Sequence, residues 1–140
     1  MKTREFSKVE QIFLQQAGIE KMSTKIPYIT VENFPKLGML AALHFLEWVS
    51  KNLNGVISLP TGKTSEYFIK YTKFFLENWD TPRGQELLAS HGIAGVMKPE
   101  LGGLHFVQMD EFYAISSKQH NSFYNYTENY YLKGFGLDAS

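Results

Sequence analysis

The 140-residue sequence contains no cysteine, and this absence excludes several kinds of chemistry at once. Disulfide bridges, thiol nucleophiles and zinc sites built on cysteine are all ruled out. No stretch approaches the roughly 18 consecutive apolar residues of a membrane-spanning helix, and the N-terminus has no apolar secretory core. We therefore expect a cytoplasmic protein without a membrane partner.

An excess of charge is also missing, because 14 Lys and Arg residues stand against 14 Asp and Glu residues. A chain without excess positive charge has little attraction for nucleic acid, and we expect no such partner. Aromatic residues, by contrast, make up 15% of the chain, which indicates a densely packed core or a stacking surface. The length suits one domain. We assign residues 1–27 to a helical extension and residues 28–140 to an α/β domain.

The central stretch of the sequence combines a short apolar run with a glycine turn. Residues Val56–Leu59 read as a buried strand that stops at Pro60. Gly62 permits a turn whose backbone N–H groups face outward, and a helical pattern then runs from about Thr64 to Trp79. Free amides and the positive end of the helix dipole converge at such a junction. The stretch therefore predicts a site for an anion such as a phosphate group.

Hydrophobic periodicity and capping residues predict further elements on both sides of this turn. They are a helix ending near Gly18, a short strand at Tyr28–Val31, a helix from Pro35 to about Asn52, a helix from the N-cap Thr81 to Gly92, and a strand at Leu104–Met109. A strand, helices and a second strand in this order imply a parallel crossover. We expect an α/β fold with a Rossmann-like, open, mainly parallel sheet flanked by helices.

The second strand runs directly into a pair of acidic residues, Asp110 and Glu111. Ligands of open parallel sheets bind at the carboxyl ends of the strands. The turn at Thr61–Thr64 and the acidic pair should therefore face one cleft. Because Asp110 would end a buried strand, partial desolvation could adapt its carboxyl group to proton transfer.

A Gly-Lys-Thr after a strand, with a later strand ending in Asp-Glu, is one pattern of a P-loop nucleotide hydrolase. The phosphate loop of that class needs a second glycine five residues before Gly62. Ile57 occupies that position, inside the strand, and only Pro60 and Thr61 separate Leu59 from Gly62. The loop is short for a triphosphate, so this hydrolase stays as a third alternative.

Three motifs carry a resemblance that uses more of the chain. Leu59–Thr64 resembles the Leu-Pro-Thr-Gly-x-Thr turn of the glucosamine-6-phosphate deaminases, and Gln108–Phe112 resembles their Asn-Met/Leu-Asp-Glu-Tyr motif. His120–Tyr126 is similar to their His-Pro-x-Ser-Tyr stretch. The related 6-phosphogluconolactonases carry Ser-Gly-Gly at the turn and an Arg after the Asp-Glu. This chain has Pro-Thr-Gly and a phenylalanine there, which favours the amino-sugar branch.

The resemblance implies a reaction and a role for each matched residue. The reaction is isomerisation and deamination of glucosamine 6-phosphate to fructose 6-phosphate and ammonia, without a metal or an organic cofactor. By resemblance, Asp110 is the base that moves a proton from C2 to C1, and Glu111 supports it. The substrate-binding residues are those of the phosphate turn and of the third motif: Thr61, Gly62, Lys63, Thr64, His120 and Ser122.

Two departures from the family pattern leave an alternative open. Phe112 and Phe123 replace tyrosines, which removes two hydroxyl groups that could bond the sugar. The family's second half, with an Asp-Gly-His segment that opens the sugar ring, has no counterpart up to Ser140. We therefore expect the N-terminal part of such an enzyme, which associates with a missing C-terminal half or with copies of itself. The alternative is a non-catalytic module that binds a phosphosugar or regulates in response to it.

Overall fold

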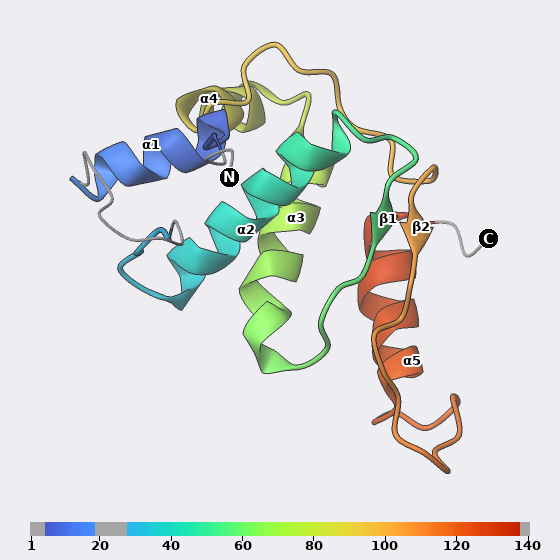
Figure 1. The fold of residues 1–140 in the computed structure, drawn as a ribbon. Helices are drawn as coiled ribbons and strands as arrows, with labels where there is room; N and C mark the ends of the chain where they lie inside the picture. The colour runs from blue at the N-terminus through green and yellow to red at the C-terminus, as the bar shows by residue number, and fades with distance from the viewer. Residues whose placement is uncertain (1–4, 19–27, 138–140) are drawn as a thin grey trace.

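The computed structural model describes residues 5–18 and 28–137 and consists mainly of helices (Figure 1). The first four helices are α1 (Lys8–Gln16), α2 (Phe34–Val49), α3 (Glu66–Asn78) and α4 (Pro82–Ser90), and the strands are β1 (Val56–Ile57) and β2 (His105–Phe106). Near the end of the chain, α5 (Phe123–Thr127), a π-helical turn (Glu128–Leu132) and α6 (Lys133–Phe135) follow one another without a break. We call this continuous segment, residues 123–135, the tail helix. None of the helices in the described ranges is long and apolar enough to cross a membrane.

Capping side chains explain where the first helices begin. The Asn33 side chain accepts a hydrogen bond from the Lys36 amide at 2.9 Å and starts α2. Thr81 accepts one from the Gly84 amide at 3.0 Å and starts α4. Both helices carry a proline in their first turn, where a missing N–H costs nothing. The predicted helices before and after the central turn are therefore confirmed.

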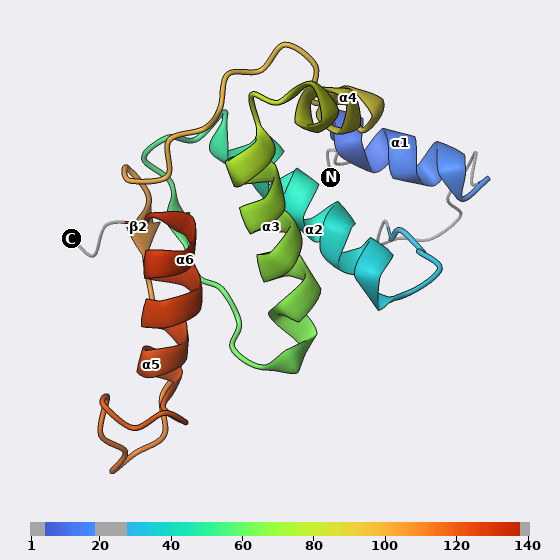
Figure 2. The same ribbon diagram turned by 180° about the vertical axis from the view of Figure 1, so that it is seen from behind.

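The core lies where α2 and α3 pack side by side (Figure 2). A Cβ atom added to Gly38 would lie 2.3 Å from the Cβ atom of Tyr67, so glycine is required for this close approach. Buried apolar side chains from both helices fill the interface, among them Leu40, Leu43, Leu46, Val49, Phe68, Ile69, Phe75 and Leu76. Val9 and Phe13 of α1 belong to the same core.

The expected Rossmann-like, mainly parallel sheet is wrong. The sheet in the described residues has two strands of two residues each. Their pairing is parallel, with Val56 opposite His105 and Ile57 opposite Phe106, so the predicted parallel arrangement is confirmed. Residues 28–31 form no strand. An apolar pattern predicts an extended segment, but a sheet also needs neighbouring segments to pair with. Sequence periodicity does not show how many such segments will pair.

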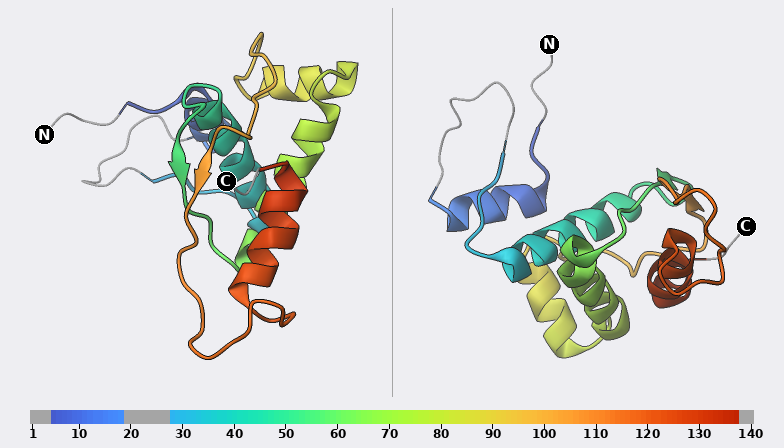
Figure 3. Two further views of the ribbon diagram at one scale, coloured as in Figure 1. Left: turned by 90° about the vertical axis from the view of Figure 1, so that its right-hand side faces the viewer. Right: turned by 90° about the horizontal axis from the view of Figure 1, so that it is seen from below.

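The tail helix lies beside the strand pair, and all views agree on this placement (Figures 1 to 3). The rings of Phe106 on β2 and Tyr131 on the tail helix have centroids 6.1 Å apart. Val56 and Val107 are more than half exposed, whereas Ile57 is buried. The turn after β1, the segment after β2 and the tail helix together contain all the expected site residues.

Candidate functional site

The glycine turn joins β1 to α3 through a short 3₁₀ turn at Lys63–Ser65. Gly62 has a φ of 102°, a conformation that strongly favours glycine because it has no Cβ atom. No heavy atom lies within 4 Å of the position that a Cβ of Gly62 would occupy, so the backbone conformation, not crowding, sets this requirement.

Three consecutive amides at this turn are unpaired. The N–H groups of Gly62, Lys63 and Thr64 donate to no acceptor among the described residues. The 3₁₀ turn and α3 both begin without a hydrogen bond from a capping side chain. Unpaired N–H groups at the start of a helix are the backbone arrangement that binds anions.

A hollow of about 390 Å³ opens beside these amides. It is lined by Gly62, Lys63, Glu66, Ile69, Tyr126 and Tyr130. The rings of the two tyrosines have centroids 4.6 Å apart and form an aromatic wall. The hollow thus combines a lysine ammonium, a carboxylate and an aromatic surface, and we call it the turn hollow.

Asp110 and Glu111 line a different hollow of about 400 Å³, together with Gln108, Ile115, Ser117 and Tyr124. Both hollows have tyrosines of the tail helix in their walls. The expected single cleft is thus replaced by two hollows that this helix borders. Asp110 is exposed, so the desolvation expected for its carboxyl group is not found.

The Glu111 carboxylate binds the start of the tail helix. It accepts hydrogen bonds from the amides of Phe112 at 2.9 Å, Phe123 at 3.0 Å and Tyr124 at 2.9 Å. Partial desolvation raises the pKa of Glu111, but the bonds from these three amides and from Gln108 outweigh it and lower the pKa overall. Glu111 thus ties the segment after β2 to the tail helix.

The third motif also serves the start of this helix. Ser122 is buried, and its hydroxyl accepts a hydrogen bond from the Asn125 amide at 2.9 Å and donates one to the Ser117 carbonyl at 3.2 Å. Its hydroxyl is therefore occupied as an N-cap. His120 is exposed, three residues before the first residue of the helix.

Two tyrosines of the tail helix contact the glycine turn, and sequence reasoning did not assign them to the site. The Tyr126 hydroxyl lies 3.1 Å from the Gly62 carbonyl oxygen and 3.1 Å from Ser65 Oγ. The Tyr131 hydroxyl donates to the Pro60 carbonyl. The signal that could have found them is the aromatic tail itself, because a buried tyrosine hydroxyl needs a hydrogen-bond partner.

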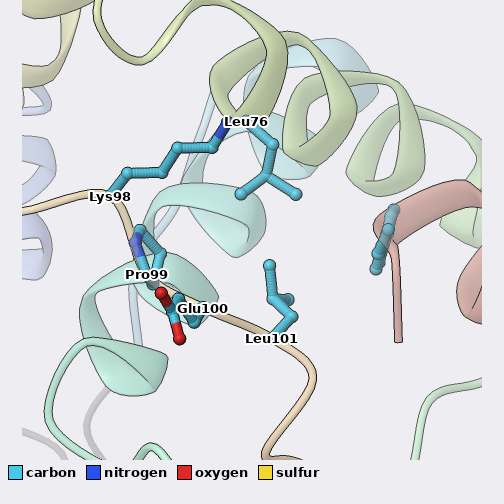
Figure 4. Close-up of a pocket in the computed structure, with 6 residues that line it drawn as sticks. Leu76, Lys98, Pro99, Glu100 and Leu101 are labelled. Atoms are coloured by element: carbon cyan, nitrogen blue, oxygen red, sulfur yellow. The ribbon is translucent and has the colours of Figure 1, made fainter. Parts of the chain in front are cut away.

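A third hollow, of about 440 Å³, lies between α3, the loop before β2 and the tail helix. Figure 4 shows Leu76 of α3 and Leu101 of the loop at this hollow, with Lys98, Pro99 and Glu100 along the loop. None of the residues expected at the phosphosugar site lines it. It is therefore separate from the candidate site.

Comparisons with known proteins identify no family for this chain. No family model matches the sequence, no curated protein matches it, and no solved structure matches it. The resemblance to the amino-sugar phosphate deaminases thus rests on the three motifs alone.

Proposed function

We propose that this chain binds the phosphate group of a phosphorylated amino sugar at the turn between β1 and α3. The observation that carries the proposal is the set of three neighbouring unpaired amides at Gly62, Lys63 and Thr64. They lie at the positive end of the α3 dipole, which stabilises a bound anion. The exposed Lys63 ammonium adds a positive charge to the same hollow.

The other walls of the turn hollow suit the rest of such a ligand. The apolar face of a sugar ring packs against aromatic rings, which Tyr126 and Tyr130 provide. The Glu66 carboxylate can accept a hydrogen bond from an ammonium group, although it repels a phosphate. A ligand with a phosphate at one end and an amine elsewhere satisfies both charges of the hollow.

Titration of the ¹⁵N-labelled protein with glucosamine 6-phosphate tests this assignment. The amide resonances of Gly62, Lys63 and Thr64 should shift more than those of the rest of the chain. Lys63→Ala should weaken binding about tenfold, which corresponds to ~1.4 kcal/mol. Lys73→Ala, which removes an exposed lysine further along α3, is the matched control and should leave the affinity unchanged. Equal losses in both variants would contradict a local phosphate site.

A comparison of ligands tests the amino group separately. The wild-type protein should prefer glucosamine 6-phosphate over glucose 6-phosphate, because only the first carries an amine for Glu66. Glu66→Gln removes the negative charge at nearly constant shape and should abolish this preference. A preference that persists in Glu66→Gln would reject the role of this carboxylate and leave the phosphate site intact.

A second candidate function is the deaminase reaction itself, with Asp110 as the base. The observation that favours it is the parallel register of β1 and β2, because the turn and the acidic pair follow the carboxyl ends of neighbouring strands. Release of ammonia from glucosamine 6-phosphate measures this activity. Asp110→Asn should abolish turnover and largely preserve binding, and equal turnover in that variant would reject Asp110 as the base.

A further inference from the structure

The tail helix contacts the carbonyl side of the phosphate turn at two places. Tyr126, 64 residues beyond Gly62, reaches the Gly62 carbonyl, and Tyr131, 71 residues beyond Pro60, reaches the Pro60 carbonyl. Both hydroxyl groups come from the same helix and bind carbonyls two residues apart. The turn is thus held from outside its own segment of the chain as well as from within, where the Ser65 amide donates to the Gly62 carbonyl at 3.3 Å.

Because the peptide group is planar, a contact that holds its carbonyl also orients its N–H group. In a trans peptide the C=O and the following N–H point in opposite directions, and the described chain contains no cis peptide. A Gly62 carbonyl that is held in place therefore fixes the direction of the Lys63 N–H, which is opposite to its own. The Lys63 N–H is one of the unpaired amides beside the turn hollow.

The protons at Gly62 can be assigned. Ser65 Oγ donates its single proton to the Gly62 carbonyl at 2.8 Å. The proton of the Tyr126 hydroxyl then goes either to the same carbonyl or to Ser65 Oγ, each at 3.1 Å. In both arrangements the Tyr126 hydroxyl belongs to the network that fixes the Gly62 carbonyl.

We propose that Tyr126 is a positioning residue for the phosphate turn, whose hydroxyl holds the Gly62 carbonyl so that the Lys63 amide faces a bound phosphate. This inference rests on the proposed function, because it takes the turn hollow as the phosphate site. The positioning role of Tyr126 lies in its hydroxyl group, because a phenylalanine at this position would keep the ring. Tyr131 acts on Pro60 in the same way, but its complete burial also makes it a core residue.

Tyr113, in the segment between β2 and the tail helix, provides a matched control. It lines neither the turn hollow nor the hollow beside Asp110, and its side chain is fully exposed. Its hydroxyl makes no hydrogen bond within the described part of the chain. Tyr126→Phe and Tyr113→Phe therefore remove the same atom from a tyrosine, but only the first breaks a contact with the turn.

The experiment measures the affinity for inorganic phosphate and for glucosamine 6-phosphate in both variants. Tyr126→Phe should weaken both about fivefold, the effect expected for one lost hydrogen bond, and Tyr113→Phe should change neither. Ser65→Ala, which removes the other hydroxyl of the network, should also weaken binding and serves if Tyr126→Phe does not fold. Wild-type affinity in Tyr126→Phe, or an equal loss in Tyr113→Phe, overturns the proposal.

A second measurement, on the free protein, separates failure of this inference from failure of the proposed function. The Lys63 amide should change its chemical shift and its rate of hydrogen exchange in Tyr126→Phe but not in Tyr113→Phe. If the wild-type protein binds neither ligand, the proposed phosphate binding is wrong. The Lys63 amide in the free protein still tests whether Tyr126 positions the turn. An unchanged Lys63 amide in Tyr126→Phe overturns the positioning role, and a changed one supports it.

Discussion

The helical part of the molecule, α1–α4, and the site region share one hydrophobic core, but they differ in their exposure and in their long-range hydrogen bonds. In the helical part, side chains such as Leu43 and Leu46 are completely buried between helices. In the site region, formed by β1, β2, the segment between β2 and the tail helix, and the tail helix itself, Val107, Met109 and Phe112 are more than half exposed. There, Ile57, Tyr131 and Phe135 join the same core, and long-range hydrogen bonds from the tail helix connect the segments.

Apolar burial and hydrogen bonds contribute differently to the stability of the fold and to the geometry of the site. Burial of apolar surface has no preferred direction, so it stabilises the helical part without placing a particular atom. Hydrogen bonds are directional and set the orientation of a peptide group or a helix end, but each adds little net stability. We therefore expect mutations of buried side chains to change global unfolding, and mutations of the exposed, hydrogen-bonded groups of the site region to change local order.

The largest effect should come from the helical core. Leu43→Ala removes a completely buried side chain and should lower the free energy of unfolding by about 2–5 kcal/mol. Leu37→Ala, in the same helix but 46% exposed, should change it by no more than about 0.5 kcal/mol. Urea denaturation monitored by circular dichroism measures both. Similar losses in the two variants would contradict the assignment of the core to the inner face of α2.

An intermediate, pH-dependent effect should come from Tyr131, where the two regions meet. Burial raises the pKa of Tyr131 from 10.0 to about 12; the bond with Ser65 lowers it, and repulsion from Tyr126 adds to the rise. A raised folded-state pKa means that its contribution is complete below pH 10 and is lost as pH rises through 12. The stability difference between the wild-type protein and Tyr131→Phe should therefore shrink over this interval.

Urea denaturation at neutral pH and at several values between pH 10 and 12 follows this difference. Tyr130→Phe is the control, because its half-exposed hydroxyl has no such contact in the described structure. A Tyr131→Phe curve that stays parallel to the wild-type curve at all pH values would contradict burial of this hydroxyl.

The smallest global effect should come from Glu111. Glu111→Gln removes a charge and one acceptor oxygen from the start of the tail helix, so the amides of Phe123 and Tyr124 should exchange their hydrogens faster. Because the folded-state pKa of Glu111 is lowered, its contribution is present above its ordinary pKa of 4.5 and is lost as pH falls through the folded-state pKa. Hydrogen exchange measured by NMR at neutral and acidic pH tests both statements.

Glu128→Gln is the matched control for this prediction. It removes a carboxylate of the same helix that pairs with Lys133 at 2.9 Å and lies five residues after Phe123. Exchange at Phe123 and Tyr124 should stay at the wild-type rate in this variant. A global loss of stability in Glu111→Gln, comparable to that of Leu43→Ala, would remove the distinction between the two regions.

Local signals in the sequence were sufficient for the helices and for the turn. Thr81 followed by Pro82 predicted the start of α4, and Gly62 predicted a turn between a strand and a helix, which the structure confirms. The extent of the sheet was not predictable in this way. Val107 and Met109 continue the apolar run of β2, but no strand is assigned beyond Phe106.

Within the site, too, the sequence indicated some residues, whereas the structure was needed to show what they contact. The motif around Glu111 marked an acidic residue after a strand, and the structure places its carboxylate on the amides of Phe123 and Tyr124. The aromatic tail was visible in the sequence, but nothing in it indicated which hydroxyl groups would meet a backbone carbonyl. Tyr126 and Tyr130 are four residues apart and similar in sequence context, yet Tyr126 is the one whose hydroxyl contacts the turn.

The sequence by itself determined the helices, their caps and the glycine turn, because each depends on residues within a few positions of one another. The tertiary structure decided how many strands pair, which tyrosines hold the turn and that two hollows replace one cleft. These features depend on contacts between residues more than 60 positions apart, such as Gly62 and Tyr126. Local periodicity carries no information about how the chain closes such long loops.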